Sequence, residues 1–386
     1  MAKNAILHIS ADYPSPFDVK APTVAISDML DAASEKFDNY LLVPKRQRAP
    51  VRFQCVKESH KLYLSFFDPL SWLGIGIDKR LDWVRLVIDE LLDGVVPAVV
   101  HSHKLSYEAR IGAIVASCFG VPHIITVRGH SDTHSRNLNP WAARVSRRLL
   151  ENSAKNLWLS AWAIGVMRNK AGYKTTSRDL VFPSALSDDL VEVLKPVCLD
   201  QKASIKLVCV CRLNDLSQKG IFQLMAGLAL VVKGGGDYYL DLIGRYDDVS
   251  LRTLEGLVQM YGLRERVQIL GPMAREEVLS ALPGYSALVM TSERETFGLV
   301  YLEALFSGLP FVYLAGSGVD GHEFAVRFGY RVGSREPEAL AGVLQELGAS
   351  HLLRRRDVLR ARQLGELWYL TGSGLKDRYL GVLGNL

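Results

Sequence analysis

The sequence of 386 residues contains little cysteine and no long uninterrupted apolar segment. Its five cysteines form no C-x-x-C pair, so we interpret them as small core residues of a protein in a reducing cytosol. The longest apolar stretch, residues 111–127, is broken by Gly120, Pro122 and His123. That interruption favours a helix, a turn and a strand over a membrane span. We expect a cytoplasmic protein, or one that contacts the inner face of the cytoplasmic membrane peripherally.

Low-complexity segments and repeats of solenoid period are also missing. With 48% hydrophobic and 23% charged residues, the composition excludes a disordered, collagen-like or coiled-coil chain. The net charge of +5 is a mild excess, which suits anionic ligands without requiring nucleic acid. At roughly 100–200 residues per domain, the length predicts two domains.

Short β-rich runs alternate with amphipathic stretches in the first half of the chain. We expect helices at 23–36, 81–92 and 107–119, and strands at 5–10, 39–44, 98–101 and 123–128. The strands are nearly all apolar, which is typical of a parallel sheet that is buried on both faces.

The second half repeats this alternation. Helices are predicted at 220–232, 249–261 and 298–307, and strands at 206–211, 238–243, 267–270, 287–291 and 311–315. Two doubly wound α/β domains follow, 1–185 and 186–365, with the polar segment 184–204 as linker. After 342–347 the chain continues into two more helical stretches without a sheet partner. We therefore expect residues 366–386 to return to the first domain.

Charged side chains follow two strands of the second domain, where parallel sheets bind ligands. Arg212 follows one strand, and Lys219 precedes the next helix. An arginine guanidinium can donate hydrogen bonds to two phosphate oxygens at once, and a lysine ammonium adds a point charge. This pair would therefore suit a diphosphate. Glu295 lies before another helix and Glu303 lies inside it, about two turns away, so both carboxylates can face one ligand. Ordinary solvated loops are the alternative interpretation.

The order of these motifs resembles that of retaining glycosyltransferase family 4, which has the GT-B fold. The resemblance covers most of residues 205–325 and rests on four motifs: R-L-x(5)-K-G from Arg212 to Gly220, L-I-G at 242–244, R-V-x-x-L-G at 266–271, and E-x(7)-E at Glu295 and Glu303. It implies two Rossmann-like domains facing a central cleft, a nucleotide-sugar donor held mainly by the second, and a C-terminal helix that crosses back to the first.

The resemblance also implies roles for individual residues. Arg212 and Lys219 would hold the donor diphosphate, Glu303 the ribose hydroxyls, and Glu295 the donor sugar. The remaining donor-binding positions are Gly244, Gly271, Met273, Thr296, Phe297, Gly298 and Leu299. Two departures are Cys211, where the family usually has glycine, and Arg245-Tyr246, where it often has a second glycine.

The first domain departs further from the family. The loop after its first strand, residues 12–22, contains no glycine, and only Lys20 could supply charge to a phosphate there. The family commonly has a histidine facing the donor sugar at the position of Arg128. Either Arg128 or His130 could serve here. His103 follows a strand, as in the family's H-x-H. With no Cys or Glu at ligand spacing, we expect no metal and no cofactor.

A basic and aromatic segment follows these residues. Trp141 precedes three arginines, Arg144, Arg147 and Arg148. Such a face suits an anionic membrane surface or a lipid-diphosphate-linked acceptor, and an ordinary solvated helix is the alternative.

The implied activity is transfer of a sugar from a UDP- or GDP-sugar to a hydroxyl of a glycan or lipid-linked acceptor, in bacterial exopolysaccharide or lipopolysaccharide synthesis. Arg212, Lys219 and Glu295 would be catalytic, with Arg128 or His130 on the acceptor side. Two alternatives remain. One is a GT-B nucleotide-sugar epimerase, and the other is an inactive partner subunit that binds nucleotide or lipid.

Overall fold

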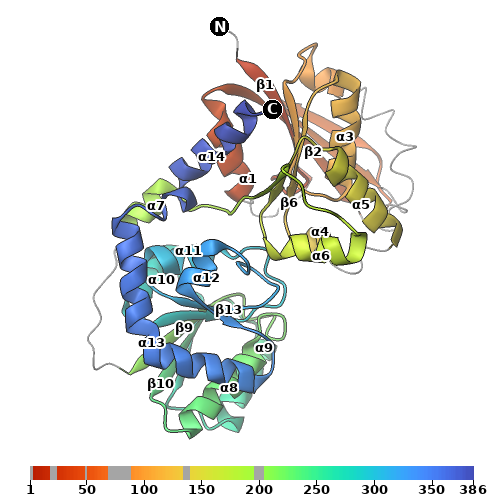
Figure 1. Cartoon of the computed structure of the whole chain (residues 1–386). Helices are drawn as coiled ribbons and strands as arrows, with labels where there is room; N and C mark the ends of the chain where they lie inside the picture. Colours follow the sequence, from red (N-terminus) through yellow and green to blue (C-terminus); the bar gives the residue numbers. More distant parts are fainter. Residues whose placement is uncertain (1–2, 18–23, 48–49, 68–87, 134–139, 195–203) are drawn as a thin grey trace. The chain divides into compact units, whose positions relative to one another are not determined.

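Two parallel sheets organise the chain in the computed structural model, which describes residues 3–17, 24–47, 50–67, 88–133, 140–194 and 204–386 (Figure 1). The chain divides into two compact units. The first comprises residues 1–184 and 372–386, and the second comprises 185–371. The sequence predicted these boundaries at 185/186 and 365/366.

The first unit is built on an eight-stranded sheet with the order β3-β4-β2-β1-β5-β6-β7-β8. Only β3 and β4 pair antiparallel. The strands are β1 (Asn4–Ile9), β2 (Phe37–Gln47), β3 (Gln54–Glu58), β4 (Lys61–Phe67), β5 (Val99–Ser102), β6 (His123–Val127), β7 (Lys155–Trp158) and β8 (Asp179–Val181). The helices described are α1 (Val24–Ser34), α3 (Tyr107–Phe119), α4 (His130–Thr133), α5 (Pro140–Asn152), α6 (Trp162–Ala171) and α14 (Gly372–Gly384).

The second unit has a six-stranded, wholly parallel sheet with the order β11-β10-β9-β12-β13-β14. Its strands are β9 (Ile205–Val210), β10 (Tyr238–Ile243), β11 (Val267–Gly271), β12 (Ala287–Met290), β13 (Phe311–Leu314) and β14 (Gly329–Val332). Its helices are α7 (Asp188–Val193), α8 (Ile221–Lys233), α9 (Asp248–Met260), α10 (Arg275–Ala281), α11 (Leu299–Phe306), α12 (Glu323–Phe328) and α13 (Pro337–Gln363).

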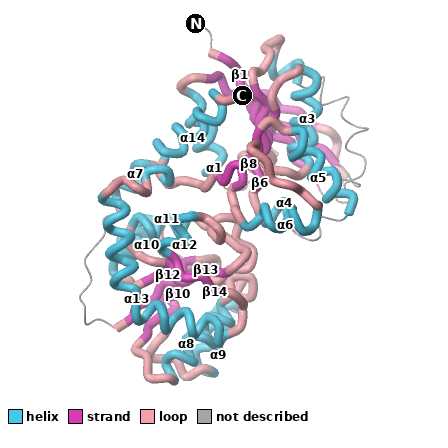
Figure 2. Tube along the Cα trace, in the orientation of Figure 1, coloured by secondary structure: helices cyan, strands magenta, loops and turns pink. Residues whose placement is uncertain are grey.

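Each sheet is covered on both faces by helices. In the second unit, α8 and α9 lie on one face and α11 and α12 on the other (Figures 1 and 2). The apolar runs form the core as predicted: Leu207, Leu240 and Val289 from the strands are fully buried against Leu224 and Leu228 of α8. Burial on both faces explains why these strands are almost entirely apolar.

The sheet order creates one switch point in each unit. In the first unit, the strands that follow β1 are added on its β2 side, and the strands from β5 onward are added on its other side. In the second unit, β10 and β11 are added on one side of β9, and the strands from β12 onward on the other. The loops at the carboxyl ends of such a strand pair diverge, which leaves room for a ligand. The sites described below lie at these two positions.

The predicted alternation of strands and helices, and the two-domain α/β fold, are confirmed. The β3–β4 hairpin, β14 and α12 were not predicted. The segment predicted as the linker begins at the boundary between the two units, and its described part contains the short helix α7. The helical stretches expected after 342–347 belong to α13, which has 27 residues, and to α14. The expected helix at 81–92 lies partly outside the described residues, and residues 88–92 of it are helical.

The C-terminal helix α14 belongs to the first unit. The hydroxyl of Tyr379, which is fully buried, lies 2.6 Å from Nδ1 of His101 in β5, and Lys376 forms an ion pair with Glu35. No helix within the described ranges is long and apolar enough to cross a membrane.

Candidate functional site

Lys219 and Glu295 form an ion pair at the switch point of the second unit. Lys219 lies in the loop after β9 and Glu295 in the loop after β12, and Nζ is 2.9 Å from Oε2. Their side chains are 16% and 20% exposed, so the pair remains accessible to a ligand. The structure thus brings together two side chains that the sequence predicted to share a site.

The two loops are held close by backbone contacts. The N–H of Glu293 donates to the carbonyl of Gln218. Gly220 has φ of +72°, and a Cβ there would lie 2.5 Å from the carbonyl oxygen of Thr291. Only glycine therefore permits this approach of the loop after β9 to the end of β12.

A third loop, which follows β13, fixes the backbone of Glu295. The hydroxyl of Ser317 donates to the carbonyl of Ser292 at 2.6 Å and accepts the N–H of Glu295 at 3.1 Å. The N–H of Gly318 donates to the carbonyl of Glu295. These contacts were not predicted, because the sequence analysis assigned no role to the loop after β13.

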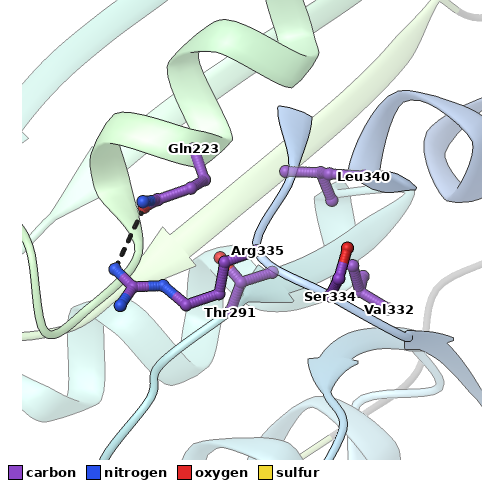
Figure 3. Close-up of a pocket in the computed structure, with 6 residues that line it drawn as sticks. All are labelled: Gln223, Thr291, Val332, Ser334, Arg335 and Leu340. Atoms are coloured by element: carbon purple, nitrogen blue, oxygen red, sulfur yellow. Dashed lines mark hydrogen bonds between the residues drawn. The ribbon is translucent and has the colours of Figure 1, made fainter. Parts of the chain in front are cut away.

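Arg335, between β14 and α13, ties the first two loops together. Its guanidinium donates to Glu293 at 2.9 Å, to the carbonyl of Ser217 at 2.7 Å and to Gln223 at 3.4 Å. Figure 3 shows this side chain reaching toward Gln223 along a small pocket, whose lining residues are Gln223, Thr291, Val332, Ser334, Arg335 and Leu340. Arg335 therefore acts as a clamp on the loops that carry Lys219 and Glu295.

The helix α11 begins beside this pair. Gly298 caps it, and the carbonyl of Gly298 accepts the N–H of Tyr301. The first N–H groups of a helix, here those of Leu299 and Val300, have no such partner and favour an anion. Phe297 is 3% exposed and its ring packs against His322 and Phe324, so its side chain belongs to the core beside the site. Thr296 is half-buried.

Glu303 pairs with a cation that was not predicted from the sequence. Its Oε1 accepts a hydrogen bond from Nη2 of Arg275 at 2.8 Å, and its side chain is 12% exposed. Arg275 begins α10, and its own side chain is 45% exposed. Glu295 and Glu303 are thus each paired with a different cation.

The predicted glycines lie where backbones meet. Gly244 follows β10 and donates its N–H to the carbonyl of Gly271 at 2.8 Å. A Cβ on Gly244 would lie 1.7 Å from the carbonyl oxygen of Cys211, which explains glycine at this position. Tyr246 packs against Gly271, and Met273 is half-buried in the loop that follows.

Arg212 is exposed beside these backbones, and its side chain has no partner among the described residues. Its loop is nevertheless anchored: the N–H of Cys211 donates to Ile243 and that of Leu213 to Arg245. A guanidinium in this position is available to a phosphate.

Arg128 is buried at the switch point of the first unit, where it is 6% exposed. Its Nε donates to the carbonyl of His103 at 2.9 Å, and its backbone N–H donates to Asp132 at 2.7 Å. Burial lowers the pKa of its guanidinium, and Asp12, Glu108 and Asp132 oppose that shift. His130 is half-buried at the start of α4.

Three fully buried histidines, His8, His101 and His103, have ring nitrogens within 4.8 Å of one another. Both ring nitrogens of His101 form hydrogen bonds, one with the hydroxyl of Tyr379 and one with that of Thr126. His8 also uses both, toward His103 at 3.0 Å and Asn39 at 3.1 Å. A metal would have to displace these bonds, so we interpret the cluster as a hydrogen-bond network. Burial lowers the pKa of each imidazole, that of His8 to about 4.

Two acidic groups lie beside Arg128. Glu108 in α3 is fully buried, and burial raises the pKa of its carboxyl to about 8. Burial also raises the pKa of Asp132 to about 6. Lys104 pairs with Asp12 at 2.6 Å. These groups were not predicted from the sequence, because an acid in the first turn of a helix is common.

The helix α5 presents the predicted basic residues. Arg144 and Arg148 are exposed, and Arg147 lies 3.6 Å from Glu151. Trp141 is 39% exposed, and the guanidinium of Arg110 lies 4.6 Å from its ring centroid.

Residues 204–349 match the model of the family described as glycosyl transferases group 1. The matched residues make up most of the second unit. The D-inositol 3-phosphate glycosyltransferase of Streptomyces griseus subsp. griseus is 32% identical over 137 residues, which are 34% of this chain and 28% of that protein. The 2-deoxystreptamine glucosyltransferase of Streptomyces kanamyceticus is 24% identical over 65% of each chain. The chain spans less than two fifths of the D-inositol 3-phosphate glycosyltransferases it matches.

Solved structures resemble the chain over nearly its whole length. The apo lipopolysaccharide outer core galactosyltransferase WaaB has a TM-score of 0.70 at 15% identity, with 99% of each chain covered. The UDP complex of Anabaena Alr3699/HepE has a TM-score of 0.65 at 14% identity, covering 99% of this chain and 100% of the other. The chain has the GT-B fold, as predicted.

We predict that Arg335→Ala weakens UDP binding several-fold, because the clamp holds both loops of the Lys219–Glu295 pair. Each hydrogen bond to a charged group contributes about 1.5–3 kcal/mol. Arg335→Lys keeps the charge but loses the planar guanidinium that donates to several acceptors at once, so we expect an intermediate effect. Isothermal titration with UDP measures this. Arg327→Ala, which breaks the exposed pair with Glu366, is the control. Equal effects of Arg335→Ala and Arg327→Ala would exclude a clamp.

We predict that the free energy of unfolding of the wild type, compared with that of Glu108→Gln, falls as pH rises from 5 to 8. The folded-state pKa of Glu108 is raised from 4.5 to about 8, so its protonated form is favoured by folding. The contribution of Glu108 to the free energy of unfolding is therefore fully present below the pKa of the unfolded state. It is lost as pH rises through the pKa of the folded state. Urea unfolding of both proteins across this range measures the difference. A difference independent of pH would contradict the raised pKa.

Proposed function

We propose that the protein is a retaining glycosyltransferase, which moves a sugar from a UDP- or GDP-sugar to a hydroxyl of a glycan or lipid-linked acceptor. The observation that carries the proposal is the Lys219–Glu295 pair at the β9/β12 switch point, with Arg212 exposed nearby. All three residues lie within the segment that matches the model of glycosyl transferases group 1.

A nucleotide-sugar donor is supported by the neighbours of the fold. Structures of Anabaena Alr3699/HepE are described with UDP, with UDP and glucose, and with UDP-glucose. In this chain, Arg212 and Lys219 would hold the diphosphate and Glu303 the ribose hydroxyls. Gly244, Gly271 and Met273 would border the base. UDP is the nucleotide that we propose to test first.

The difficult step of the proposed reaction is the departure of the nucleoside diphosphate while positive charge develops on the sugar. Arg212 and Lys219 would stabilise the charge that grows on the leaving phosphate. The phosphate would compete with Glu295 for Lys219, and the released Glu295 carboxylate would then accept hydrogen bonds from the donor sugar. The proposal needs no metal for this stabilisation. Arg128 or His130 would act on the acceptor side.

The neighbour WaaB, a lipopolysaccharide outer core galactosyltransferase, supports a place in bacterial surface polysaccharide synthesis. The basic face of α5, with Arg144, Arg147, Arg148 and Trp141, supports contact with an anionic membrane. We therefore place the protein in the cytoplasm, peripherally on the inner face of the membrane.

We predict that Lys219→Ala and Glu303→Ala each weaken UDP binding by about tenfold or more, because each removes a charge-assisted hydrogen bond. Isothermal titration measures the binding, and turnover of a UDP- and GDP-sugar panel with and without acceptors measures the activity. Lys233→Ala and Glu255→Ala are the matched controls, since both side chains are exposed on α8 and α9.

Unchanged UDP affinity in Lys219→Ala and Glu303→Ala would refute the donor site. Conversion of the nucleotide sugar to an epimer without an acceptor would identify an epimerase instead. An enzyme that binds UDP but never consumes a donor would be the inactive partner.

We predict that Arg144→Glu/Arg148→Glu abolishes binding to vesicles of phosphatidylglycerol and phosphatidylcholine, since each basic residue near such a surface contributes about 1 kcal/mol. Co-sedimentation measures this binding, which should also fall with salt. Arg252→Glu/Arg264→Glu makes the same change of net charge on exposed positions of the second unit and should bind like the wild type. Equal binding by all three proteins would exclude α5 as the contact.

A further inference from the structure

A polar cluster lies at the switch point of the first unit, where the loops after β1 and β5 meet. Six side chains from three loops and two helices form it, and we call it the first-unit cluster: Asp12, His103, Lys104, Glu108, Arg128 and Asp132. The loop after β1 reaches α3 directly, because the N–H of Ala11 donates to Oε1 of Glu108 at 3.0 Å. Ligands of doubly wound sheets bind at this kind of position.

The cations of the cluster are balanced by its acids. Lys104 is 2.6 Å from Asp12 and is also attracted by Glu108 and Asp132. Arg128 faces the same three carboxyl groups. Three acids therefore surround two cations, which leaves no excess positive charge to neutralise a phosphate.

Two carboxyl oxygens of the cluster have no hydrogen-bond partner in the described part of the chain. They are Oε2 of Glu108 and Oδ1 of Asp132, whose residues are 0% and 5% exposed. Each can accept a hydrogen bond when ionised. Buried polar groups are nearly always paired, so two such oxygens at one site indicate a missing donor.

The third unpaired atom is Nδ1 of the fully buried His103, and its neighbours make it an acceptor as well. The amide nitrogen of Asn39 donates to Leu30, so its oxygen accepts Nε2–H of His8. Nδ1 of His8 then accepts Nε2–H of His103. This assignment leaves a lone pair on Nδ1 of His103.

We propose that the first-unit cluster binds the acceptor sugar through hydroxyl or ammonium hydrogen-bond donors and disfavours a phosphate at that position. The proposal rests on the proposed glycosyl transfer and names the class of acceptor group that it uses. Ligand donors would pair with Oε2 of Glu108, Oδ1 of Asp132 and Nδ1 of His103, the three atoms that have no hydrogen-bond partner in the described part of the chain. The ion pair of Asp12 and Lys104, 35% and 20% exposed, is where the cluster reaches the surface.

The raised pKa values of Glu108 and Asp132 agree with this geometry. Burial disfavours their ionised forms, and a ligand that brings donors or a positive charge would favour ionisation again. An ammonium group satisfies both requirements, so an amino sugar should bind at least as tightly as a neutral one.

Three sugars that share the same glucose ring test this proposal: glucosamine, glucose and glucose 6-phosphate. Each is titrated into the full-length protein, saturated with UDP, and followed by NMR. We expect glucosamine to bind as tightly as glucose or more so, and glucose 6-phosphate to bind at least tenfold more weakly than glucose. Glu108→Gln and Asp132→Asn should each weaken glucosamine binding by about tenfold and glucose binding by less, because both substitutions remove a charged acceptor.

Glu90→Gln and Asp31→Asn are the matched controls, because both side chains are exposed in the first unit. Binding of glucose 6-phosphate as tight as that of glucose, binding of none of the three sugars, or equal effects of cluster and control variants would each overturn the proposal. UDP affinity on the same samples separates the two hypotheses. A wild type that does not bind UDP contradicts the donor site, whereas normal UDP binding without the expected sugar preference contradicts only the acceptor assignment.

Discussion

The parallel order of the two sheets is the constraint on which the rest of the structure depends. In a parallel sheet every carboxyl end lies at the same edge, and at a switch point the two adjoining loops leave in opposite directions. The pairs β1/β5 and β9/β12 are such points. Side chains far apart in sequence meet there: His8 and His103 are separated by 95 positions, and Lys219 and Glu295 by 76.

Charge is balanced differently at the two positions. In the second unit, Lys219 and Glu295 pair with each other at a partly exposed site, and Arg212 remains exposed beside them. A polyanion that binds there can pair with Arg212 directly and can replace Glu295 as the partner of Lys219. In the first unit, Arg128 and Glu108 are buried and acids outnumber bases in the cluster. The proposed site of the second unit therefore suits phosphates, and the first-unit cluster suits groups that donate hydrogen bonds.

The fold and much of the second-unit site could be predicted from the sequence, because Arg212 and Glu295 follow strands, Lys219 precedes a helix, and all three belong to motifs with regular spacing. Gly244 was predicted from its motif alone, and the structure supplies the reason, a carbonyl of Cys211 where a Cβ would lie. Whether the predicted site residues bind a donor stays a prediction.

Other contacts could not be predicted, because their partners are distant in the chain and belong to elements that the periodicity did not show. Arg335 meets Ser217 across 118 positions and follows β14, a strand that was not predicted. Glu108 looked like an ordinary acid at a helix start, and only the pairing of β1 with β5 reveals that the loop after β1 buries it. Burial creates the chemistry of such a group, and burial is a property of the fold.

The same reasoning explains how one chain can treat two polar substrates differently. A diphosphate is charged, so its site needs cations. Burying those cations completely would carry a large desolvation penalty in the absence of ligand, so they lie where water can still reach them. A hydroxyl carries no net charge, so buried acceptors can recognise it by geometry alone. Lys219 is accordingly partly exposed, whereas Glu108 and His103 are fully buried. The depth of each group therefore follows from the charge of the ligand that it is proposed to bind.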